Sequence, residues 1–116
     1  MLVAMGYDVH ITRGDWWEDD REHISDQEWA SVVERDPNLT MTGEVSASTP
    51  TGETLTYRND LLAMWTSHPS GEPVPFDFRD GRVVVKNPDD PILAKMIELA
   101  ASLNAVVQGD EGETYP

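Results

Sequence analysis

Cysteine is absent from the sequence, which excludes disulfide bonds, thiolate metal sites and cysteine catalysis. Basic residues are scarce: eight Lys and Arg stand against 22 Asp and Glu, and the net charge is −14. Because nucleic acids and anionic lipid surfaces are bound through Lys and Arg, we expect neither a nucleic acid nor a membrane as partner. A chain of this charge attracts a basic protein, although an acidic surface also serves solubility alone.

Long apolar runs are missing too, and no segment approaches the ~20 apolar residues that a membrane helix needs. Residues 1–5 lack a basic region and are too short for the apolar core of a secretory signal. We therefore expect a cytoplasmic protein in which Met5 can serve as an alternative start and residues 1–4 are dispensable. The 116 residues, 39% of them hydrophobic, predict one domain over 1–116 with its own core.

A capping box predicts the start of the first helix. Ser25 is the N-cap, Glu28 follows three residues later, and Ile24 before the cap can pack on Trp29. Pro37 ends the helix at the residue before it, because that residue disfavours helical geometry.

A second helix is predicted after Asp90, which can cap it, with Pro91 in the first helical position. A wide apolar stripe follows, and Asn104 ends the helix in the left-handed conformation. Residues 105–108 then form a short closing strand, and a helix that continues through them is the alternative. Residues 109–116 make an acidic tail.

Alternating apolar and polar residues predict the strands. These strands lie at 7–13, 39–47, 55–57, 61–65, 74–78 and 83–85. Asp80-Gly81 predicts a two-residue hairpin, because a type I′ turn needs positive φ at both central residues. The order of elements predicts an α+β fold, an antiparallel or mixed sheet of about six strands with two helices packed on one face.

No motif for catalysis or for binding a metal or nucleotide is present. The stretch 109–112 carries acidic residues where a phosphate cradle needs bare backbone N–H groups. The histidines, His10, His23 and His68, have none of the spacings of a metal site. We therefore expect a protein that is not an enzyme and has no metal and no cofactor.

The acidic loop between the first strand and the first helix is the predicted contact surface for a partner. Its candidate contact residues are Trp16, Trp17, Asp19, Asp20 and Glu22. An exposed tryptophan surrounded by carboxylates suits a basic partner. The alternative is that these aromatic side chains cover the sheet, since tryptophan is highly buried on average.

A small-ligand or metal-dependent enzyme is the runner-up hypothesis. Asp8 and His10 share the polar face of the first strand, where their side chains can converge on a ligand, and His68 is the third candidate. This hypothesis requires one pocket that contains all three residues. A third hypothesis, an oligomeric structural protein, requires a self-complementary apolar patch.

Four segments carry a resemblance: Tyr7–Arg13, Ile24–Trp29, Val85–Asp89 and Val107–Glu113. With them the chain resembles a group of small acidic bacterial proteins of unknown function over nearly its whole length after Met5. In size, acidity and α+β composition it is also similar to immunity proteins of bacterial polymorphic toxin systems. Together with the charge, this second resemblance implies a non-enzymatic protein-binding domain, an immunity-like inhibitor of a basic partner, whose oligomeric state stays open.

Overall fold

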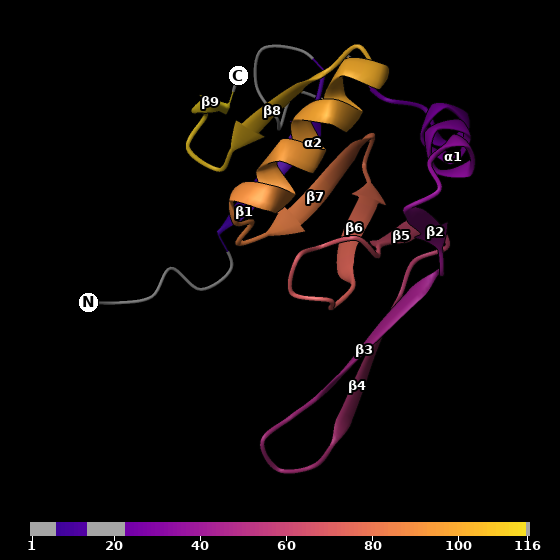
Figure 1. Ribbon diagram of the computed structural model, residues 1–116, viewed down its shortest axis with the longest axis vertical. Helices are drawn as coiled ribbons and strands as arrows, with labels where there is room; N and C mark the ends of the chain where they lie inside the picture. Colours follow the sequence, from indigo (N-terminus) through magenta and orange to yellow (C-terminus); the bar gives the residue numbers. More distant parts are fainter. Residues whose placement is uncertain (1–6, 14–22, 116) are drawn as a thin grey trace.

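Two helices pack on a seven-stranded sheet in the computed structural model, which describes residues 7–13 and 23–115 (Figure 1). The elements are β1 (Asp8–Thr12), α1 (Asp26–Arg35), β2 (Leu39–Met41), β3 (Glu44–Ser48), β4 (Thr54–Arg58), β5 (Leu62–Trp65), β6 (Val74–Arg79), β7 (Arg82–Lys86), α2 (Asp90–Ser102), β8 (Val106–Gly109) and β9 (Thr114–Tyr115). The sheet runs β2-β5-β6-β7-β1-β8-β9 with every neighbouring pair antiparallel, and β3 and β4 form a separate two-stranded sheet. The predicted α+β class is confirmed, with seven strands in the main sheet rather than about six.

One face of the sheet carries the core. Val9 and Ile11 point to it from β1, and their cross-strand partners on β7 and β8 are buried beside them. In Figure 1, α2 lies over β1 and β8, whereas α1 lies beside β2. Trp29 of α1 is fully buried in this core, stacked on Phe78 at 6.0 Å, and its indole N–H donates to the carbonyl of Leu61 at 2.8 Å. That bond satisfies the polar group that burial of a tryptophan would otherwise leave unpaired.

The start of α1 confirms the predicted capping box. The Glu28 backbone N–H donates to Ser25 Oγ at 3.1 Å, and the Ser25 N–H donates to Glu28 Oε1 at 3.0 Å. The helix ends at Arg35, and Asp36 is its C-cap, as Pro37 predicted.

The start of α2 differs by one residue from the prediction, because Asp89 and not Asp90 is the N-cap. The Asp89 carboxylate accepts the N–H of Ile92 at 3.1 Å, three residues on, which is the reach of a capping side chain. Its second oxygen lies 2.7 Å from His68 Nε2, a contact from a distant loop that the local sequence does not reveal.

Two turns agree with their sequence signals. Asp80 and Gly81 have φ of 53° and 76° and join β6 to β7 as a tight hairpin. Asn104 has φ of 54° and separates α2 from β8, so the closing strand is confirmed and the longer helix is wrong. The predicted acidic tail returns along β8 as β9, with Val107 opposite Tyr115.

The single strand predicted at 39–47 is divided between two sheets. Gly43, with φ of 73°, follows β2, and the Leu62 carbonyl accepts the N–H groups of both Thr42 and Gly43 at 3.1 Å. The chain then leaves the main sheet as β3, which pairs only with β4 among the described strands. Figure 1 shows this β3–β4 hairpin projecting away from the body of the protein. Alternation predicts a strand but does not say which sheet the strand joins.

The described helices include none that is long and apolar enough to cross a membrane.

Candidate functional site

The predicted contact segment is bounded on both sides by described residues that lie together. Trp16, Trp17, Asp19, Asp20 and Glu22 themselves lie outside the described residues. Before the segment, Arg13 donates from Nη1 to the carbonyl of His23, the first described residue after it, at 3.0 Å. A hydrogen bond therefore joins the two described residues that flank the segment.

Arg13 is held from two further sides. Its Nη1 and Nη2 donate to the two carboxylate oxygens of Glu28 at 3.0 and 2.6 Å, a bidentate pair. Its Nε and Nη2 donate to the carbonyl of Leu103 at 3.1 and 2.6 Å, so the C-terminal end of α2 joins the same cluster. Hydrogen bonds from Arg13, and then from the Ser25 backbone, lower the pKa of Glu28 to about 2. The local sequence predicts the capping box of Glu28 but not its second partner, Arg13, which lies 15 residues away.

The far end of the segment also lies against the β6–β7 turn. Ile24 donates its backbone N–H to the Gly81 carbonyl at 2.9 Å. The His23 side chain packs so closely on Gly81 that a Cβ there would lie 2.4 Å from His23 Nδ1. His23 thus lies close in the chain to one exposed carboxylate, that of Asp26 on α1, and packs on the turn that carries another, that of Asp80.

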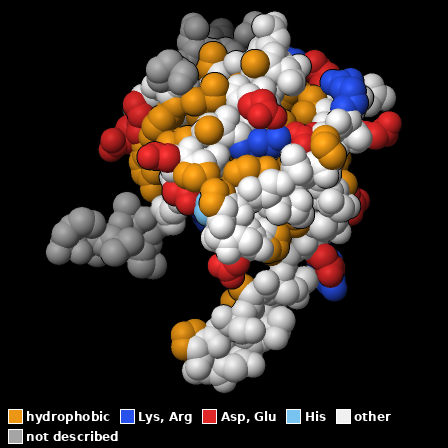
Figure 2. All heavy atoms as spheres, in the orientation of Figure 1, with side chains coloured by type: hydrophobic (Ala, Val, Ile, Leu, Met, Phe, Trp, Pro, Cys, Tyr) orange, Lys and Arg blue, Asp and Glu red, His pale blue; other side chains and the backbone are white. Residues whose placement is uncertain are grey.

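Most of the basic side chains that the structure describes form ion pairs with carboxylates of the same chain. The ion pairs are Arg13–Glu28, Arg58–Glu44, Arg79–Asp77, Lys86–Asp8 and Lys95–Asp36. Exposed carboxylates that form no ion pair with a described residue are those of Asp26, Glu34, Glu53, Asp60, Glu72, Asp80, Asp90, Glu111 and Glu113. The unpaired charge on the surface of the described residues is therefore mostly acidic, and Figure 2 shows Asp and Glu side chains spread over one face of the body.

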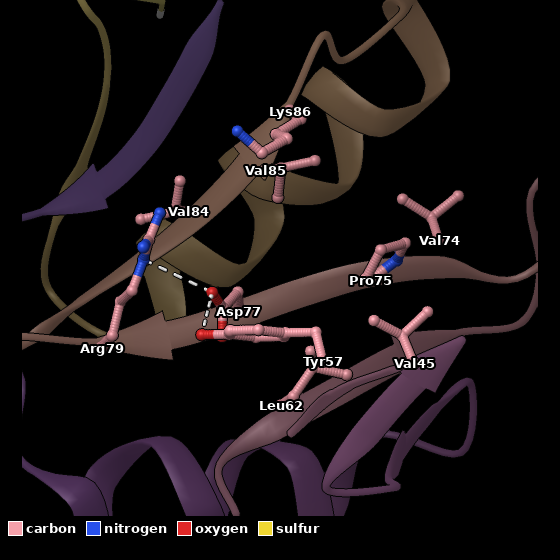
Figure 3. Close-up of a pocket in the computed structure, with 10 residues that line it drawn as sticks. All are labelled: Val45, Tyr57, Leu62, Val74, Pro75, Asp77, Arg79, Val84, Val85 and Lys86. Atoms are coloured by element: carbon pink, nitrogen blue, oxygen red, sulfur yellow. Dashed lines mark hydrogen bonds and ion pairs between the residues drawn. The ribbon is translucent and has the colours of Figure 1, made fainter. Parts of the chain in front are cut away.

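A groove of about 320 Å³ lies between the β3–β4 hairpin and the second face of the main sheet (Figure 3). Its lining is largely apolar, with charged groups at one side: Val45, Tyr57, Leu62, Val74, Pro75, Asp77, Arg79, Val84, Val85 and Lys86. Asp77 ties the hairpin to the sheet, because Tyr57 Oη donates to its Oδ2 at 3.0 Å and Asn59 Nδ2 donates to its Oδ1 at 2.6 Å. Burial, and then the hydrogen bond to Asp77, raise the pKa of the Tyr57 hydroxyl.

His10 lies on this second face, and the polar side of β1 is buried here. His10 and Thr12 are each 2% exposed. His10 lies in register between Val84 and Gln108, both of which are also buried. His10 Nε2 lies 2.9 Å from Asp110 Oδ1, and the pKa of His10 is lowered on balance, chiefly by burial, although the hydrogen bond to Asp110 acts to raise it. Asp110 is thus a partner that the sequence analysis placed in a tail.

His68 lies in the β5–β6 loop, on the helix side of the sheet. Its ring meets Trp65 edge-on at 5.7 Å, and its Nε2 lies 2.7 Å from Asp89, the N-cap of α2. Because the Ser70 backbone N–H donates to Nδ1 at 3.0 Å, Nδ1 is the acceptor, and Nε2 carries the proton that Asp89 accepts. His68 therefore fastens a loop to a helix end, and the structure does not bring it to Asp8 and His10.

Among residues 7–13 and 23–115, no group of three His, Asp or Glu side chains is placed to hold a metal ion. Comparison of the chain with protein-family models, with curated proteins and with solved structures finds no match.

Proposed function

We propose that this chain is a non-enzymatic protein-binding domain that holds a basic partner, in the manner of an immunity-type inhibitor. The observation that supports the proposal is the arrangement of charge. The basic side chains of the described residues are mostly engaged in ion pairs, whereas many exposed carboxylates have no such partner. Such a surface steers a basic protein toward the chain and gives a fast, salt-sensitive association.

The predicted contact loop is the centre of the proposed interface. Arg13 and His23, the described residues on either side of it, are joined by a hydrogen bond, and exposed carboxylates follow on α1 at Asp26 and in the β6–β7 turn at Asp80. A loop closed at its base loses less conformational freedom on binding than an open one, which lowers the cost of association. In this proposal Trp16 and Trp17 are the aromatic anchors, and Asp19, Asp20 and Glu22 form the charged rim.

The partner is sought first by affinity capture of the tagged protein from a lysate of its native host, at low and at moderate salt, with mass spectrometry as the readout. We expect one basic protein in stoichiometric amount whose recovery falls as salt increases. A captured protein that is acidic, or whose recovery does not depend on salt, contradicts the proposal.

Charge reversal then tests the site on the captured partner. Asp19→Lys with Asp20→Lys is expected to slow association and to reduce its dependence on salt. Glu72→Lys with Glu111→Lys makes the same change of net charge at exposed sites on other loops and is the matched control. Equal association rates for the two double variants would remove the loop from the interface.

A further inference from the structure

The β3–β4 hairpin has an apolar face and a polar face. Directly opposed residues share a face in an antiparallel pair, so Val45 with Tyr57 and Ala47 with Leu55 lie on one side. The opposite side carries the pairs Glu44–Arg58, Ser46–Thr56 and Ser48–Thr54. Val45 and Tyr57 line the groove at the base of the hairpin, so its apolar face continues the groove outward to Leu55.

This apolar face is uncovered. Leu55 is 63% exposed and Tyr57 is 44% exposed, the two highest values among the large hydrophobic side chains that the structure describes. In the described part of the chain, neither β3 nor β4 pairs with a further strand, so both outer edges present free backbone groups. A two-stranded hairpin is marginal in water unless its apolar face packs on something. We therefore expect the apolar face of the hairpin to pack against another surface.

The hairpin is also the least acidic part of the molecule. From Val45 to Tyr57 the only charged residue is Glu53, in a chain of which 26% is charged. At the base Glu44 and Arg58 neutralise each other at 3.2 Å. Figure 2 shows this arm nearly free of charged side chains beyond its base. The hairpin therefore offers a basic partner almost no carboxylates to bind. Its apolar face suits a contact with an uncharged surface.

A second copy of the chain fits these conditions. Two bodies of charge −14 repel each other, and they come together most easily where the surface is neutral and stands away from the bodies. A two-fold contact uses the same patch on both copies, so an arm laid antiparallel on its partner places each tip against the other base.

We propose that the β3–β4 hairpin is a dimerisation arm. The apolar faces of two hairpins pack on each other about a two-fold axis, and Leu55 of each copy covers the groove beside Val45 and Tyr57 of the other. The proposal uses a surface different from the acidic loop and is independent of the function proposed above.

Sedimentation velocity over a wide concentration range tests the dimer directly. We expect a monomer–dimer equilibrium that strengthens as salt is added, because screening weakens the repulsion between the two acidic bodies. Binding of a basic partner has the opposite salt dependence, so the two associations are distinguishable. A protein that stays monomeric at every protein and salt concentration overturns the proposal. It does so also if the NMR signals of Tyr57 and Val74 shift when a small apolar ligand is added, because the groove is then a ligand site and not a dimer contact.

A matched pair of variants locates the contact. Leu55→Lys is expected to weaken the dimer by at least about tenfold, since it buries a charge in the apolar contact. Thr54→Lys adds the same charge at the neighbouring position on the polar face and is expected to leave the dimer as strong as the wild type. Both residues are exposed, so both variants keep the core and their melting temperatures check the fold. Equal weakening by the two variants overturns the proposal.

Cross-linking gives a second, structural readout. The chain has no cysteine, so a mixture of a Leu55→Cys chain and a Val45→Cys chain can form only introduced disulfides. We expect the mixed disulfide to form faster than the one between Thr54→Cys and Val45→Cys chains. Equal rates for the two mixtures contradict the antiparallel packing of tip on base.

Discussion

His10 and Asp110 are 100 residues apart in the sequence, and His10 Nε2 lies 2.9 Å from Asp110 Oδ1. The other oxygen, Oδ2, accepts the backbone N–H of Asp8 at 2.8 Å. One carboxylate thus fastens the β8–β9 turn to β1. Burial alone would raise the pKa of Asp110, but the bonds from Asp8 and His10 lower it on balance.

Replacing Asp110 by alanine should therefore destabilise the protein. The change removes the acceptor of both bonds, and we expect a loss of about 1–3 kcal/mol in the free energy of unfolding. Urea denaturation gives the value. Glu111→Ala, at the exposed next residue, is the control and should have almost no effect. A loss no larger than that of the control would show that the pair does not hold the turn.

His10 should make stability depend on pH near neutrality. Its pKa in the folded protein is lowered from 6.5, chiefly by burial, so the unfolded chain binds a proton more readily. The contribution of neutral His10 to the free energy of unfolding is therefore fully present above pH 6.5. It is lost as the pH falls through 6.5 toward the lower pKa of the folded state. An NMR titration should place the His10 midpoint below those of model peptides, and His10→Gln should flatten the stability profile between neutral and mildly acidic pH. A midpoint above 6.5 would reverse the sign and refute the assignment.

Lys95, a buried residue of α2, should be costly to remove. Its Nζ lies 2.5 Å from Asp36 Oδ2 and 2.8 Å from Glu98 Oε2, and its side chain is only 7% exposed. Lys95→Met leaves the Asp36 carboxylate, whose side chain is only 12% exposed, without its ion-pair partner, and we expect a loss of up to about 3–5 kcal/mol in thermal or urea denaturation.

Two comparisons make the Lys95 experiment specific. Asp36→Asn combined with Lys95→Met should be more stable than Lys95→Met alone, because no mostly enclosed carboxylate is then left unpaired. Glu98→Gln should change stability by less than about 1 kcal/mol, since Glu98 is 66% exposed. If the double variant were the least stable of the three, the loss would come from packing rather than from the unpaired carboxylate.

Gly81→Ala should destabilise more than Gly71→Ala. Both glycines have positive φ, 76° and 83°, so alanine is strained by roughly 1–2 kcal/mol at either site. At Gly71 nothing lies within 4 Å of the added Cβ, whereas at Gly81 the Cβ would lie 2.4 Å from His23 Nδ1. The difference between the two melting temperatures measures the contact with His23. Equal losses would show that His23 moves aside freely.

Glu28 should titrate far below an ordinary glutamate. Its pKa is lowered to about 2, and Arg13→Ala removes the larger cause and should return the midpoint toward 4.5. The stability that this carboxylate contributes is present above its unfolded pKa and is lost as the pH falls through 4.5 toward 2. Carbon-detected NMR of the carboxyl group follows the titration. A wild-type midpoint near 4.5 would contradict the bidentate pair.

The features that the sequence predicted correctly depend on close neighbours in the chain. The capping box at Ser25, the positive φ at Asp80 and the left-handed end of α2 at Asn104 each involve residues within about four positions. The α+β class followed from the order of such elements. These signals were readable because the backbone conformation at each of them is selected by the residue itself or by a side chain within reach.

The candidate sites needed the folded chain. Alternation marks His10 and Thr12 as polar-face residues of β1 but does not show that they are buried, and Asp110 is brought to His10 by the pairing of β8 with β1. Alternation also does not predict the break at Gly43, after which β3 leaves the main sheet and pairs with β4, where Leu55 is exposed.

By itself, then, the sequence determined the acidic charge, the absence of thiol chemistry, the capping box of the first helix, the tight turns and the α+β class. Only the tertiary structure decided which sheet each strand joins, which histidine meets which carboxylate, and where an apolar face stays uncovered. The physical reason is range: caps and turns depend on contacts within a few residues, whereas strand pairing and burial depend on residues up to 100 positions apart, such as His10 and Asp110.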